Sequence, residues 1–172
     1  MNLLNIPQGN GQFERELRQI YLKGFKLAWL YANNANFNQF FHIAIVRSRD
    51  GTAPVGNDFL RTYTSARNLT LNTTLEGPDG MKPINTDLYD VLYHSKWYVG
   101  ATLSPTKHDE VFDDVYIPIN RYVNYDGPLG SDSTDKIYCV CWSVKSTRVV
   151  SDMGVDNGRL WIKCYVQWED TE

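Results

Sequence analysis

A chain of 172 residues that is 42% apolar can build one hydrophobic core but is too short for two domains of ordinary size. Its 17 basic and 20 acidic residues give a net charge of -3, which excludes a general attraction to nucleic acid and leaves only local basic patches as polyanion contacts. No apolar run approaches the ~20 residues of a membrane-spanning helix, so we expect a soluble single-domain protein.

The apolar residues follow the alternating spacing of β-strands and are rich in β-branched and aromatic side chains. The first long stretch, residues 17–31, changes phase at Gly24, because its apolar residues before and after this glycine have opposite parity. A β-bulge at Lys23-Gly24 would place both sets on the core side. We therefore predict one long, bulged first strand.

The rest of the chain also predicts strands. NQFFHIAIVRSRDG is apolar on both sides, which is typical of a covered second strand. Residues 50–85 carry most of the turn residues and predict a long excursion with a short helix or strand inside it. Further strands are predicted at YDVLYHSKWYVGATL, FDDVYIPINRYVNYDG, KIYCVCWSV and RLWIKCYVQWE. Pro118 indicates either an edge position or a bulge for its strand. Leu160 begins a predicted inward stripe that ends at Trp168. Because strands and helices do not alternate, the sequence predicts an antiparallel sandwich.

The leader IPQGNGQFER, followed by IYLKGFKL, resembles the opening of the single jelly-roll capsid proteins of small circular single-stranded DNA viruses, circovirus-like and geminivirus-like. In that family a Gln-Gly-x-Gly-x-x-x-Arg element leads into the first strand, and Gln8, Gly9, Gly11 and Arg15 occupy its places. The strand motifs quoted above follow in the family's order over nearly the whole chain. Gly9 and Gly11 would let the leader bend through positive φ or pass close to a neighbour.

The resemblance implies an all-β fold, an eight-stranded antiparallel jelly-roll β-sandwich over residues 1–172 with residues 1–16 as an N-terminal arm. It also implies a coat protein that self-assembles into a small icosahedral shell enclosing a single-stranded nucleic-acid genome. The expected partners are other copies of the chain, single-stranded DNA and a host receptor bound by the outer loops, with no membrane. The expected location is the virion, assembled inside the infected host cell, and Met1 to Ile6 lack the features of a secretory signal. Many coat proteins of this family begin with a run of arginines and lysines. The first fourteen residues of this chain contain no Lys or Arg, which is a departure from the family pattern.

Two sets of residues are candidates for contacts. In the family the chain start lies toward the shell interior, so the basic residues nearest to it are the nucleic-acid candidates: Arg15, Arg18, Lys23 and Lys26. Large rings predicted to lie opposite the core stripes are the subunit-interface candidates: Tyr98, Tyr116, Trp161 and Tyr165. The alternative for the basic residues is that they only form a solvated strand face. The alternative for the large rings is that the long loops cover them.

Catalytic and metal-binding patterns are weak in this sequence. His42, His94 and His108 lie in separate segments without metal-ligand spacing, and we expect ordinary strand and loop residues rather than a triad. Cys139, Cys141 and Cys164 are expected to be buried structural thiols. An acidic cluster could supply oxygen ligands to calcium at a subunit junction, and it comprises Asp109, Glu110, Asp113 and Asp114. We predict no enzyme activity and assign no catalytic residue.

Two other functions remain open at this stage. A lectin-like or trimeric jelly-roll binding module, which presents loops to a carbohydrate or receptor, would use the same fold as a small oligomer. A cupin-type enzyme would require a His/Glu metal set that the sequence does not show.

Overall fold

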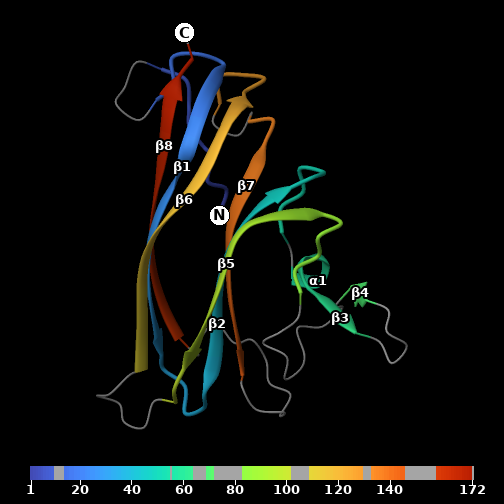
Figure 1. The fold of residues 1–172 in the computed structure, drawn as a ribbon, viewed down its shortest axis with the longest axis vertical. Coiled ribbons are helices and arrows are strands. Elements are labelled where there is room, and N and C mark those ends of the chain that lie inside the picture. The colour runs from blue at the N-terminus through green and yellow to red at the C-terminus, as the bar shows by residue number, and fades with distance from the viewer. Residues whose placement is uncertain are drawn as a thin grey trace.

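The computed structural model describes residues 1–9, 14–54, 56–63, 69–71, 83–101, 109–129, 133–145 and 158–171. Within these ranges the fold is all-β apart from one helical turn, and two antiparallel sheets face each other as a sandwich (Figure 1). The predicted fold class is confirmed at this level. No described helix has the length and apolar character that a membrane crossing requires.

Each sheet contains three long strands, and the first two strands of the chain are the central ones. One sheet has the order β6-β1-β8 and the other has the order β5-β2-β7. The six strands are β1 (Gln19–Asn33), β2 (Gln39–Ser48), β5 (Tyr89–Val99), β6 (Asp109–Asn124), β7 (Lys136–Lys145) and β8 (Gly158–Asp170). The first strand therefore pairs with the last, and the second pairs with the penultimate one.

β1 contains the predicted bulge. Its register shifts between Leu22 and Gly24 against both β6 and β8. A Cβ at Gly24 would collide with the backbone carbonyl of Ile117, so this close strand contact requires glycine. The apolar residues on both sides of the shift are buried in the core, as predicted: Ile20, Leu22, Phe25, Leu27 and Trp29.

β2 is covered on both faces, as its apolar pattern predicts. Phe41, Ile43 and Ile45 belong to the core between the sheets, whereas Ala44 and Val46 belong to a second apolar cluster on the outer side of the β5-β2-β7 sheet. The excursion predicted over residues 50–85 contains α1 (Gly56–Phe59) and a ribbon of β3 (Arg61–Tyr63) and β4 (Leu69–Leu71). Figure 1 shows these elements on the outer side of that sheet, and residues of the excursion contribute to the second cluster.

The structure tests one prediction about β6 and one about β8. Of the two positions predicted for Pro118, the edge position is present, because β6 lies at the edge of its sheet. Pro118 also lies opposite Gly24, where the register of β1 against β6 shifts. On β8, Ile162, Cys164, Val166 and Trp168 are half-buried and pack against the core. Leu160, near the beginning of this edge strand, is 38% exposed and does not continue the stripe as predicted.

The leader folds back on itself instead of extending as an arm. The backbone N–H of Gly9 donates to the carbonyl of Arg15 at 3.0 Å, and the N–H of Arg15 donates to the carbonyl of Pro7 at 3.0 Å. Of the two roles predicted for Gly9, a bend through positive φ is absent. The predicted close approach is present, because a Cβ at Gly9 would collide with the side chain of Glu14. Gly11 lies outside the described residues.

Candidate interaction surface

The outer faces of the two sheets differ in what covers them. The second apolar cluster covers much of the outer face of the β5-β2-β7 sheet. On the outer face of the β6-β1-β8 sheet, five large rings are between 47% and 63% exposed: Phe112, Tyr116, Tyr122, Trp161 and Tyr165. Contiguous exposed rings of this kind are typical of a surface that binds a partner.

The structure brings three of the four interface candidates together. Tyr116 and Tyr165 are both in register with Lys26 of β1, one from each neighbouring strand. Trp161 is in register with Leu30, which also faces Phe112 on β6.

Tyr98, the fourth candidate, lies apart from these three. It is exposed on β5 of the other sheet, where its ring packs edge-on against Phe40 at a centroid distance of 5.5 Å. Sequence reasoning missed Leu30 and Phe112, although their outward parity on β1 and β6 was a usable signal.

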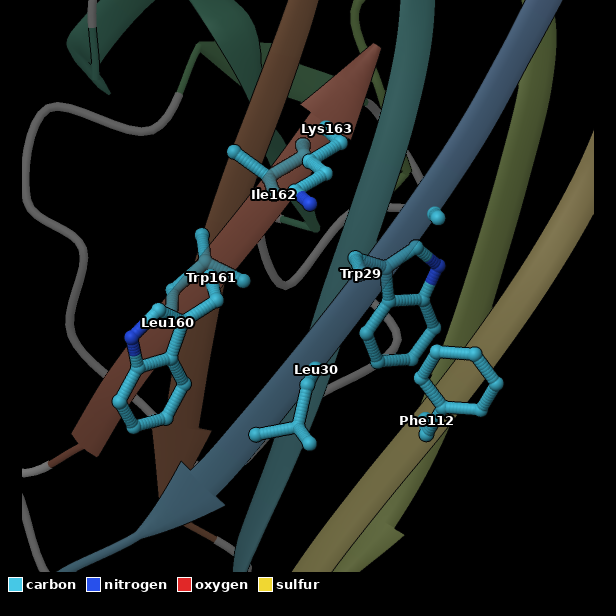
Figure 2. Close-up of a pocket in the computed structure, with 8 residues that line it drawn as sticks. Trp29, Leu30, Phe112, Leu160, Trp161, Ile162 and Lys163 are labelled. Carbon is cyan, nitrogen blue, oxygen red and sulfur yellow. The ribbon is translucent and has the colours of Figure 1, made fainter.

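An open hollow lies on this face, over the middle of β1. Ala28 is in register with Asp114 and Lys163, and its small side chain leaves space between the neighbouring rows. The hollow has a volume of about 610 Å³. Figure 2 shows Phe112 on one side of β1 and Trp161 on the other. The residues lining the hollow are Ala28, Trp29, Leu30, Phe112, Leu160, Trp161, Ile162 and Lys163.

Three of the four nucleic-acid candidates lie at the surface, and two of these are ion-paired. Lys23 pairs with Glu169, and Lys26 pairs with Asp114 at 3.6 Å. Arg18 is exposed. These pairs are solvent-exposed and each contributes little to stability, so a phosphate can compete with either carboxylate.

Arg15 is not part of that surface. Its side chain is fully buried, and its guanidinium donates to the carbonyls of Ile6 at 3.2 Å and Leu17 at 2.7 Å, and also to that of Gly127. The guanidinium carbon lies 3.9 Å from the centre of the Tyr125 ring. In this arrangement Arg15 fastens the leader to the sandwich. Nothing in the sequence distinguishes it from an exposed arginine.

The histidines are closer than the sequence predicts. His42 Nδ1 and His94 Nε2 are 3.1 Å apart, and both rings stack on Trp142. His42 and His94 are strand residues, as expected, and the register of β2 against β5 puts these two on one face of the sheet. Burial, with the nearby His94 and Lys96, lowers the pKa of His42 to about 3. His108 lies outside the described residues.

The acidic cluster lies on a strand, and strand geometry divides it. Alternation along β6 sends Glu110 and Asp114 to the outer face and Asp109 and Asp113 to the opposite one. Among the described residues, no group of three or more His, Cys, Asp or Glu side chains is arranged to hold a metal ion. The calcium expectation therefore has no site within one described chain.

The three cysteines are free, and all of them pack in or against the core, but the predicted burial is complete only for Cys139. Cys139 is buried, and Cys141 and Cys164 are half-buried. A hydrogen bond with Cys139, together with burial, raises the pKa of Cys141. Burial, together with Cys139, raises the pKa of Cys164 to about 11. These raised pKa values keep the thiols of Cys141 and Cys164 protonated and unreactive at neutral pH. The hydrogen bond with Cys141 lowers the pKa of Cys139.

The strongest candidate surface is therefore the ring-rich outer face of the β6-β1-β8 sheet. No family model matches this sequence, and a search of curated proteins also finds no match.

Proposed function

We propose that the chain is a viral coat protein, a jelly-roll subunit that self-assembles into a small icosahedral shell around a single-stranded nucleic-acid genome. The observation that carries this proposal is the ring-rich outer face of the β6-β1-β8 sheet. Monomers rarely leave contiguous large rings in water, whereas subunit interfaces are enriched in Tyr, Trp and Phe. Contact between copies would stabilise the assembly by about 25 cal/mol for each Å² of apolar surface removed from water.

The strand order supports the jelly-roll part of the proposal. β1 lies beside β8, and β2 lies beside β7 in the facing sheet. Nested pairing of this kind results when a long antiparallel hairpin rolls up into two sheets, which is how a jelly roll is organised. β3 and β4 bring the number of strands to eight, but they form their own ribbon outside the two sheets.

The genome part of the proposal assigns phosphate contacts to Arg18, Lys23 and Lys26 and removes Arg15 from that set. Exposed ion pairs such as Lys23 with Glu169 contribute little, so exchanging the carboxylate for a phosphate has a small cost. Each lysine or arginine that contacts a phosphate adds about 0.7 to the slope of log affinity against log salt for a single strand. The proposal places the chain in the virion, where its outer loops are available to a host receptor, and gives it no enzymatic role.

The test is size-exclusion chromatography of the purified chain followed by negative-stain electron microscopy. We expect closed particles, and an absorbance ratio at 260 and 280 nm above that of protein alone if nucleic acid is enclosed. The double variant W161S/Y165S should fold, by circular dichroism, and lose the particles. The control V91S changes an exposed apolar residue of β5 and should keep them.

A monomer at high concentration would overturn the coat-protein proposal. A stable trimer that binds a carbohydrate would instead support the lectin-like binding module.

A further inference from the structure

Rings and charges alternate in rows across the outer face of the β6-β1-β8 sheet. Each row takes one residue from β6, one from β1 and one from β8, as the register of β1 defines. We call these four consecutive rows the striped patch. They are Glu110-Ala32-Arg159, Phe112-Leu30-Trp161, Asp114-Ala28-Lys163 and Tyr116-Lys26-Tyr165.

The charges of the striped patch are sorted by strand. Both carboxylates, Glu110 and Asp114, lie on β6, whereas β8 carries Arg159 and Lys163. The remaining charge of the patch is Lys26 on β1, which pairs with Asp114 of the same chain at 3.6 Å. An alanine of β1 separates the acid from the base in each charged row, so the two do not meet within one chain. Within the described residues, Glu110, Arg159 and Lys163 make no ion pair. The patch therefore has an acidic edge, a basic edge and rings on both.

We infer that the striped patch binds the same patch of a second copy, face to face, with the strands of the two copies parallel. In this dimer a two-fold axis runs along β1, and β6 of each copy faces β8 of the other. The Lys26 side chains of the two copies meet at this axis, each beside Asp114 of its own chain, so the dimer covers Lys26 and leaves Arg18 and Lys23 as the phosphate contacts. The inference rests on the proposed self-assembly and names the face that mediates one of its contacts. Such an interface is isologous, because each contact occurs twice.

Charge complementarity selects this orientation. With the axis along β1, Asp114 of one copy faces Lys163 of the other, and Glu110 faces Arg159. The rings of Phe112 and Tyr116 then face rings of β8. If the strands of the two copies ran antiparallel, β6 would face β6, and the carboxylates would lie over the negative faces of Phe and Tyr rings. In that arrangement Glu110 gains no cationic partner, and Asp114 keeps only Lys26 of its own chain.

The dimensions of the face suit a stable dimer. Three strands about 4.8 Å apart, with a rise of about 3.3 Å per residue, give about 330 Å² for the striped patch and about 700 Å² for the whole face over the 15 residues of β1, so the dimer uses the whole face with the patch at its centre of contact. A standard interface buries about 800 Å² on each partner. Stacked sheets pack about 10 Å apart at roughly -30°, an offset that the long side chains of Arg159 and Lys163 can follow.

A charge-exchange experiment tests the inference on the full chain. In the single variants D114K and K163D, each dimer exchanges two opposite-charge contacts for two like-charge contacts. We expect analytical ultracentrifugation to show dimerisation weakened by about 30-fold in each variant. An equimolar mixture of the two variants should form a heterodimer in which both opposite-charge contacts are restored. The double variant D114K/K163D should likewise form a homodimer with both contacts restored. The control D126K makes the same change in charge at an exposed residue outside the patch and should dimerise like the parent.

The outcomes separate this inference from the proposed shell. Failure of the mixed variants to associate, with folding intact by circular dichroism, overturns the parallel dimer even if the parent forms particles. Rescue in the mixture without particles in the parent supports the dimer and rejects the shell. If D114K binds labelled oligothymidylate more tightly than the parent does, and its association is unchanged, the face belongs to nucleic acid and the dimer is wrong.

Discussion

Replacing Arg15 by methionine should destabilise the fold strongly, because the side chain is buried and its guanidinium serves three backbone carbonyls. Hydrogen bonds from a charged donor contribute a net ~1.5 to 3 kcal/mol each. The bond to Ile6 is fully buried, whereas those to Leu17 and Gly127 are partly buried and would regain water in the variant. After that discount we expect a loss of about 3 to 5 kcal/mol in the free energy of unfolding.

Equilibrium unfolding in urea measures this loss, with tryptophan fluorescence as the signal. The conservative variant R15K keeps the charge but loses the fork of donors, so it should fall between R15M and the parent. The control R18M changes an exposed arginine and should stay within about 0.5 kcal/mol of the parent. An R15M protein as stable as R18M would contradict the buried position of Arg15 and return this residue to the nucleic-acid candidates.

Three further predictions concern the core, the histidine pair and the thiols. G24A should lower the free energy of unfolding by about 2 kcal/mol in urea, because its Cβ meets the carbonyl of Ile117, and an unchanged midpoint would argue against the bulge. In the folded chain the pKa of His42 is about 3, below the ordinary value of 6.5. As the pH falls, this side chain is therefore protonated in the unfolded chain before it is protonated in the folded chain. Stability should therefore be constant above pH ~6.5 and lower by about 2 kcal/mol at pH 5, and H42Q should lose this component of the pH dependence. Cys164, with a pKa of about 11, should react with iodoacetamide about 100-fold more slowly in the folded chain than in urea, and equal rates would show that its thiol is accessible.

Residue parity was sufficient to predict the strands and the bulge of β1, because strand side chains alternate and a phase change needs an extra residue. Pro118 also indicated an edge position or a bulge for β6, since proline cannot donate to a second neighbour, and the edge position is present. The neighbours of each strand were not predictable in this way. Nothing local in the sequence says that β1 lies between β6 and β8, because that order depends on contacts between residues far apart in the chain.

The candidate surface was only partly predictable, because parity shows which way a side chain points but not which strands lie side by side. Outward parity identified Tyr116, Trp161 and Tyr165, but their rows exist only once β6 and β8 flank β1 in a fixed register. The pairing of His42 with His94 depends on register between strands that are distant in sequence. Arg15 was misread because a polar leader looks solvated, whereas the carbonyls that bind its guanidinium come from separate segments.

The strand register that builds the core also builds the striped patch, so the two cannot vary independently. A slip of β8 by one residue against β1 would turn Trp161 and Lys163 toward the core and Ile162 toward solvent. The bulge in β1 absorbs the phase change near Gly24, before the strand reaches the four rows, and keeps Lys26, Ala28 and Leu30 on the outer face. A mutation that removes the bulge should therefore weaken folding and association together, whereas charge exchange at Asp114 and Lys163 should weaken association alone.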